Sequence, residues 1–180
     1  MTSESNVLER IKAFIVLKLL HMRSLFPALA GMSQVRGIIR LIKENNGEIP
    51  ISKLAEEAEE DVDDLLPLIE ASKLLGFIKM SDSSIKITEL GEKLTISNPY
   101  RTIKKSLVDV EPFKTIMKLL SKRDMTTSEI ASSLASKGIV VNENPELNEE
   151  LIGRMLRGWG MRVKLFEYAE DSGVWKLKQK

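Results

Sequence analysis

The sequence predicts a mainly α-helical fold with small β-hairpins, an α+β arrangement, and three observations support this prediction. First, apolar residues recur at steps of three and four through most of the chain, as they do on one face of a helix. Second, two short stretches rich in β-branched and aromatic residues flank polar turns, as in β-hairpins. Third, each of these stretches follows a set of three helical segments, so the same order of elements occurs twice.

The composition excludes several kinds of chemistry. The chain has 180 residues, of which 43% are apolar, and it contains no cysteine and a single histidine, His21. Disulfides, cysteine-based zinc sites and histidine-rich metal sites are therefore excluded. Because most nucleophile–base pairs also need histidine or cysteine, we expect a protein that is not an enzyme and that has no cofactor or metal.

Residues 1–34 are expected to form an N-terminal helical segment. Apolar side chains that include Ile11, Phe14 and Ile15 lie at helical spacing between residues 7 and 26. This face is expected to pack on the protein's own core, with a homodimer contact as the alternative. Lys18 interrupts the most apolar stretch, which falls short of the about 20 apolar residues of a membrane-spanning helix. We therefore expect no membrane span, no secretory signal and a cytoplasmic location.

Residues 35–98 are expected to form a first unit of three helices followed by a hairpin. Acidic residues from Asp61 onward suit the start of the third helix, because they complement the positive end of the helix dipole. Gly76 suits its end. The expected segments are a helix containing residues 38–42, helices at 51–58 and 61–75, strands at 77–80 and 84–87, and a last helical piece at 88–94.

Residues 99–180 are expected to hold a linker and a second unit with the same element order. Thr126 and Glu129 have the spacing of a capping box at a helix start, and Pro145 suits the first turn of the next helix. Pro99 and Pro112 are interpreted as breakers within a connecting segment, residues 95–112. The expected segments are helices around 113–120, 126–137 and 145–160, and strands at 163–168 and 174–178.

Three helices with a short middle one, followed by a hairpin, is the pattern of a winged helix-turn-helix unit. The sequence therefore predicts two such units in tandem after the N-terminal helix. The two copies match in element order and not residue by residue. Trp159 and Trp175 are interpreted as core residues of the second unit.

Residues 35 to about 178 contain sequence strings that resemble the AAA-associated C-terminal domain family. The strings that carry the resemblance are Leu65-Leu-Pro-Leu-Ile-Glu-Ala71, Leu74-Leu-Gly-Phe77, Ile87-Thr-Glu-Leu-Gly91, Trp159-Gly160 and Leu165-Phe-Glu-Tyr168. In that family the module follows the ATPase domain of ABC transporter subunits of the nitrate, sulfonate and bicarbonate type. Residues 161–164 depart from the family's usual sequence, and the chain shows no ATPase half. The resemblance therefore implies an association with such ATPases, and it does not carry over their activity.

Charge divides the chain into parts with different expected partners. Residues 35–98 contain eight basic and thirteen acidic residues, whereas residues 99–180 contain fifteen basic and eleven acidic residues. On the third helix of the first unit, Asp63 and Asp64 are expected to face outward, where carboxylates repel nucleic-acid phosphates. We therefore expect this face and the N-terminal helix to contact protein.

The third helix of the second unit is the candidate DNA-binding element. Helical geometry places Arg154 and Arg157 opposite its apolar face, where they could reach phosphates or guanine edges. Glu149 and Glu150, at the leading end of the helix, argue against this interpretation. The candidate DNA-binding residues are Arg154, Arg157, Arg162, Lys164, Lys176 and Lys178.

Two functions therefore stay open. The first hypothesis is a winged-helix regulatory protein that binds double-stranded DNA mainly through its second unit. The alternative is a non-catalytic protein-interaction module that regulates or assembles with an ABC transporter ATPase or another protein. Salt dependence distinguishes them, because phosphate contacts make affinity fall steeply with salt.

Overall fold

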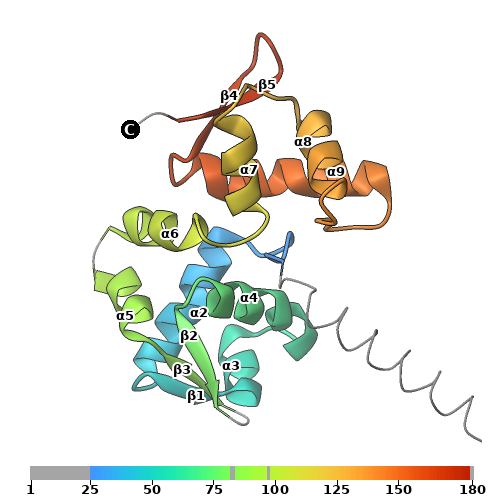
Figure 1. Ribbon diagram of the computed structural model, residues 1–180. Coiled ribbons are helices and arrows are strands. Elements are labelled where there is room, and N and C mark those ends of the chain that lie inside the picture. The colour runs from blue at the N-terminus through green and yellow to red at the C-terminus, as the bar shows by residue number, and fades with distance from the viewer. Residues whose placement is uncertain (1–24, 82–83, 97, 179–180) are drawn as a thin grey trace, which may run out of the picture.

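The computed structural model describes residues 25–81, 84–96 and 98–178 (Figure 1). The described chain is mainly helical and contains two small antiparallel sheets, which confirms the predicted fold class. The helical segment expected before residue 25 lies outside the described residues, and so do its candidate contact residues Ile11, Phe14 and Ile15. None of the helices that the structure describes is long and apolar enough to cross a membrane.

The first half of the chain follows the predicted order and adds one strand. Its hairpin, β2 and β3, pairs Ile78 with Ile87, and the unpredicted β1 adds to the β3 edge, so that the sheet order is β1-β3-β2. Positive φ angles at Asn46 and Gly47 turn the chain from α2 into β1. The elements are α2 (Met32–Glu44), β1 (Glu48–Pro50), α3 (Ile51–Ala58), α4 (Val62–Leu74), β2 (Ile78–Ser81), β3 (Ser84–Ile87) and α5 (Glu89–Ile96).

The connecting segment contains a helix, α6 (Pro99–Leu107), which corrects the interpretation of Pro99 as a breaker. The Asn98 side chain accepts hydrogen bonds from the backbone N–H groups of Tyr100 and Arg101. Pro99 occupies the first helical position, where its missing N–H costs nothing. The residue that looks like a breaker therefore starts the helix, because an asparagine cap precedes it.

The second half repeats this order. Its elements are α7 (Phe113–Leu120), α8 (Thr127–Ala135), α9 (Pro145–Met155), the π-helical turn η1 (Leu156–Met161), β4 (Phe166–Ala169) and β5 (Val174–Leu177). Met125 pairs with Trp175 of β5, just as β1 pairs with β3 in the first half. The predicted capping box of Thr126 and Glu129 is present. The hydrogen bond from the Thr126 backbone N–H is the main cause that lowers the pKa of Glu129, and the hydrogen bond from the Arg123 side chain is the second.

The third helix of the second half ends in a π-helical turn, η1, which continues directly from α9. Gly160 lies against the ring of Phe166, and a Cβ atom there would come within 2.3 Å of that ring. Lys164 has a φ of 58°, so the chain turns before β4. The predicted strand over residues 163–168 is therefore wrong at its start, because β4 begins at Phe166.

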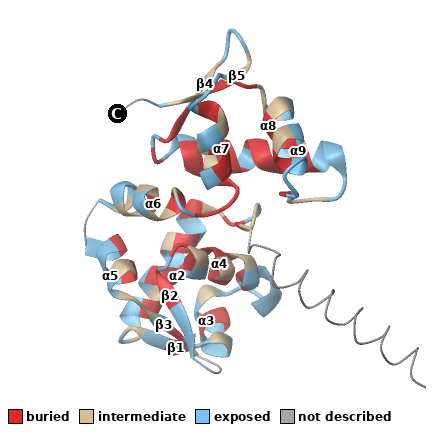
Figure 2. Cartoon of the chain, in the orientation of Figure 1, coloured by how far each residue is buried: buried red, intermediate tan, exposed pale blue. Residues whose placement is uncertain are grey.

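The two halves meet around Phe26, which belongs to the cluster of buried hydrophobic residues. Buried residues line the facing sides of both halves (Figure 2). The Phe26 ring contacts Trp159 at 4.7 Å and Phe113 at 5.4 Å between ring centroids, in both cases edge to face. Trp159 Nε1 also donates a 2.8 Å hydrogen bond to the carbonyl oxygen of Ala30. Trp159 and Trp175 are 2% and 0% exposed, which confirms that both are core residues. The boundaries at residues 34 and 98 and the winged-helix assignment remain predictions.

Candidate interaction surfaces

The first candidate surface lies where α3 passes into α4. Six carboxylates surround this turn, and none of them forms an ion pair with a described residue. Val62 and Leu66, one turn apart on α4, are 42% and 49% exposed among them. We call this the α3–α4 acidic surface, and it consists of Glu56, Glu59, Glu60, Asp61, Asp63, Asp64, Val62 and Leu66.

The local sequence explains why the carboxylates gather there. Glu59 ends α3 in the left-handed conformation, with a φ of 55°, and α4 begins three residues later. Asp63 and Asp64 occupy the first turn of α4, where they complement the positive end of the helix dipole. Both are exposed, as predicted, so the same residues stabilise the helix and charge its outer surface.

On the second half, two of the six candidate DNA-binding residues are held by intramolecular contacts. The guanidinium of Arg157 lies 5.6 Å from the ring centroid of Tyr168 and 5.8 Å from that of Trp175. Lys176 Nζ forms a 3.2 Å ion pair with Asp124. Arg157 therefore fastens η1 to the β4–β5 hairpin through cation–π contacts, which is a structural role.

The other four candidate DNA-binding residues are exposed, and their side chains form no ion pair with a described residue. They are Arg154, Arg162, Lys164 and Lys178. Arg154 lies on α9, and Arg162 and Lys164 follow η1. The backbone carbonyl of Lys164 accepts a 2.7 Å hydrogen bond from Lys104, which fixes the loop on α6.

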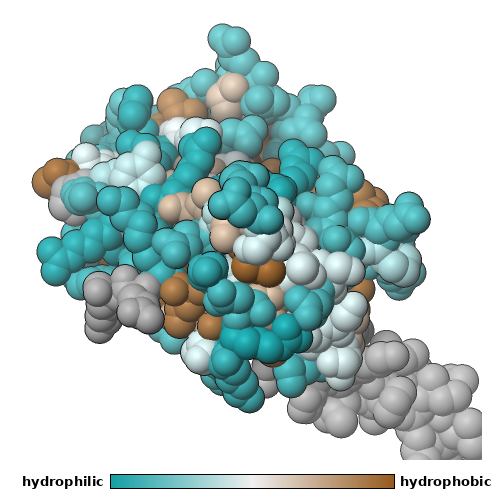
Figure 3. All heavy atoms as spheres, turned by 90° about the horizontal axis from the view of Figure 1, so that it is seen from above, coloured by the Kyte–Doolittle hydropathy of each residue, from teal (hydrophilic) through white to brown (hydrophobic). Residues whose placement is uncertain are grey.

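Carboxylates occupy the positions at which a winged helix would approach DNA. Glu146 and Glu150 are exposed on the leading half of α9, and Glu170 and Asp171 are exposed at the hairpin tip. Viewed from above, the surface is mostly hydrophilic, with apolar residues in small separate groups (Figure 3). Acidic groups therefore lie on the same elements as the candidate residues Arg154 and Lys176.

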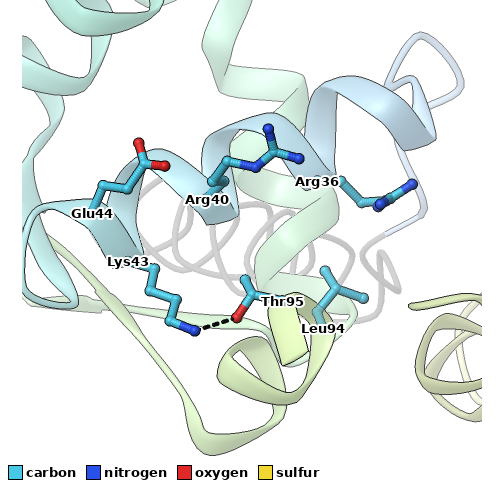
Figure 4. A pocket seen from close by; sticks show the side chains of 6 residues that line it. All are labelled: Arg36, Arg40, Lys43, Glu44, Leu94 and Thr95. Carbon is cyan, nitrogen blue, oxygen red and sulfur yellow. Dashed lines mark hydrogen bonds between the residues drawn. The ribbon is translucent and has the colours of Figure 1, made fainter. Parts of the chain in front are cut away.

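A third surface lies between α2 and α5, and the sequence analysis missed it. Arg36, Arg40 and Lys43 project from α2 beside Leu94 and Thr95 of α5 (Figure 4). These residues and Glu44 line a cavity of about 410 Å³. The signal was present in the sequence, because basic residues at positions i, i+4 and i+7 share one helix face.

The described residues contain no group of three histidine, cysteine, aspartate or glutamate side chains placed to hold a metal ion. The surfaces above consist of carboxylates, guanidinium groups, amines and apolar side chains. Such groups can form ion pairs and hydrogen bonds with a partner molecule and can bury apolar area against it.

The family model of the C-terminal AAA-associated domain matches residues 52–169, which run from α3 to the end of β4. The chain belongs to this family. No curated protein and no solved structure matches it. The match confirms the resemblance stated from the sequence strings and lies within the residues for which it was stated.

Two of the sequence strings that carry the family resemblance, Leu74–Phe77 and Ile87–Gly91, contact each other in the structure. Thr88 donates through Oγ1 to the carbonyl of Gly76 at 2.6 Å, and the same oxygen accepts from the N–H of Gly91 at 3.1 Å. The N–H of Thr88 donates to the carbonyl of Phe77. These contacts fasten the start of α5 to the end of α4, so these residues have a structural role.

Proposed function

We propose that this chain is a non-catalytic, cytoplasmic protein-interaction module that regulates or assembles with a transporter-type ATPase. The observation that carries the proposal is the pair of exposed apolar side chains, Val62 and Leu66, among the unpaired carboxylates of the α3–α4 acidic surface. This surface repels phosphate groups and gains from burial against protein.

The partner surface follows from the chemistry of the α3–α4 acidic surface. Burial of an exposed valine or leucine side chain contributes about 1.5–3 kcal/mol. Unpaired carboxylates around such an apolar centre select a partner with basic residues at its rim, because like charges in an interface cost several kcal/mol. We therefore expect a partner surface with an apolar centre surrounded by lysine and arginine.

Membership of the C-terminal AAA-associated domain family supports an ATPase as this partner. The resemblance to modules of nitrate-, sulfonate- and bicarbonate-type ABC transporters narrows the choice to that class. In those proteins the module follows the ATPase domain, so the ATPase is the partner that the resemblance implies.

Leu66→Asp is expected to weaken binding to the ATPase at least about tenfold, because an apolar contact is replaced by a further carboxylate. The measurement is isothermal titration of the full chain with purified nitrate- or sulfonate-type ATPase subunits from the same organism. The matched control is Leu147→Asp on α9, where the leucine is also exposed, at 41%. Equal affinities for the wild type and the Leu66 variant would contradict the proposed surface.

DNA binding by the second half is the second candidate function. The observation that favours it is the exposure of Arg154 and Arg162 without a carboxylate partner among the described residues. The acidic groups at the start of α9 and at the hairpin tip oppose an approach through those elements. Contact would therefore involve the end of the third helix and the loop after η1.

Arg154→Gln combined with Arg162→Gln is expected to weaken DNA binding and to reduce its salt dependence. Each phosphate contact contributes a slope of about 0.9 in the logarithmic salt dependence, so the slope should fall by about 2. The measurement is fluorescence anisotropy on duplex DNA across a salt series. Arg101→Gln combined with Lys105→Gln, at exposed positions of α6, is the control with the same change in charge. If the wild type shows no salt-dependent binding at low ionic strength, this candidate function is wrong.

A further inference from the structure

We propose that the cavity between α2 and α5 binds a small phosphate-bearing molecule through Arg36, Arg40 and Lys43. The cavity has a volume of about 410 Å³, within the range of small-molecule sites. Buried Leu94 contributes an apolar surface to it (Figure 4). This cavity is separate from the α3–α4 acidic surface, so the inference does not rest on the proposed partner.

Positive charge exceeds negative charge among the described residues that line this cavity, which are three basic residues and one acidic residue besides Leu94 and Thr95. Arg36 and Arg40 form no ion pair with any residue that the structure describes. Glu44 is the acidic residue of the lining, and its carboxylate and the Arg40 guanidinium point to one side of α2, whereas the Lys43 amine points to the other (Figure 4). Arg36 and Arg40, at positions i and i+4, repel each other on the helix surface. A bound anion would remove this repulsion.

A hydrogen bond to Thr95 holds the Lys43 side chain at the edge of the cavity. Its amine donates to Thr95 Oγ1 at 2.8 Å, and the Thr95 hydroxyl in turn donates to the carbonyl of Glu92 at 2.8 Å. Because an ammonium group has three N–H donors, two remain for a ligand. Thr95 is therefore a positioning residue that orients Lys43.

The spacing of the basic residues indicates more than one phosphate. Lys43 lies seven positions after Arg36, which corresponds to about 10 Å along a helix at 1.5 Å per residue. Arg40 and Lys43 also point to opposite sides of α2 (Figure 4), so one phosphate group does not meet both in this arrangement. Planar guanidinium groups bind phosphate oxygens in pairs, so two arginines one turn apart suit adjacent phosphates. A compound that carries a diphosphate group fits this arrangement.

Pyrophosphate and ADP are expected to bind the full chain in isothermal titration at low salt. Arg36→Gln combined with Arg40→Gln should weaken this binding at least about tenfold, because two charge-assisted contacts are lost. Arg101→Gln combined with Lys105→Gln removes the same charge from exposed positions of α6 and should leave binding unchanged. Arg36→Lys should retain part of the affinity, since it keeps the charge and loses the paired hydrogen bonds.

A second arm separates soluble phosphates from lipid headgroups. Sedimentation with phosphatidylcholine vesicles that contain phosphatidic acid tests the headgroup source, and the same variants are compared. The site is supported if either probe binds both the wild type and the control double variant but does not bind the Arg36 and Arg40 double variant. The proposal is overturned if neither probe binds the wild type at low salt, or if the two double variants bind equally well. Circular dichroism establishes that each variant is folded.

Discussion

Replacing Trp159 by alanine is expected to lower the free energy of unfolding by about 3–5 kcal/mol, the usual cost of removing a buried tryptophan. The indole is 2% exposed and packs edge to face on Phe26. Its N–H also satisfies the carbonyl of Ala30, 129 residues away in the sequence. The alanine variant therefore loses packing, leaves a cavity and removes the hydrogen bond of a buried carbonyl.

Urea unfolding followed by circular dichroism measures this change. Because domains are stable by only about 5–15 kcal/mol, the alanine variant could fail to fold, and Trp159→Phe provides the second measurement. Phenylalanine keeps an aromatic ring and loses the hydrogen bond, so a loss of about 1–3 kcal/mol is expected. Arg154→Ala, at an exposed position of α9, should stay within about 0.5 kcal/mol of the wild type. Unchanged stability of both tryptophan variants would show that Trp159 does not join the two halves.

The fold could be predicted from the sequence where the signals are local. Helical periodicity and capping residues place α3 at residues 51–58 and the start of α8 after Thr126, as observed. Helix α6 was not predicted, because a proline can either end a helix or occupy its first turn. The hydrogen bonds from the next backbone amides to the Asn98 side chain show that Pro99 starts a helix. The short β1 was not predicted, because three residues are too few to show the alternation of apolar and polar side chains that is typical of a strand. Its pairing with β3 also depends on tertiary structure.

The candidate surfaces could be predicted only in part. Exposure of Asp63 and Arg154 follows from helical geometry and was predicted correctly. The cation–π contacts of Arg157 could not be predicted, because they depend on aromatic rings that the hairpin brings next to η1. The basic residues of α2 were overlooked for another reason. The net charge of residues 35–98 is negative, and an average over the unit hides a positive cavity lined by Arg36 and Arg40.

Gly91→Ala is expected to destabilise the protein by about 3 kcal/mol, at the upper end of the usual cost of overpacking. A Cβ atom at this position would lie 2.2 Å from the carbonyl oxygen of Phe77 and 2.8 Å from Cγ1 of Ile87. The carbonyl belongs to the backbone and cannot turn away as a side chain could. It also accepts the N–H of Thr88, so movement of α5 away from Phe77 weakens that hydrogen bond.

Gly37→Ala provides the matched control, because the same chemical change is made at an exposed position inside α2. A Cβ atom there would meet nothing within 4 Å. Alanine has a higher helix propensity than glycine, so this variant should be more stable than the wild type by about 0.5–1 kcal/mol. Thermal and urea unfolding of the two variants should therefore shift in opposite directions. Shifts of the same sign and size would mean that close contact between α5 and Phe77 does not require a glycine at position 91. In that case the Thr88–Gly91 string would need an explanation other than packing.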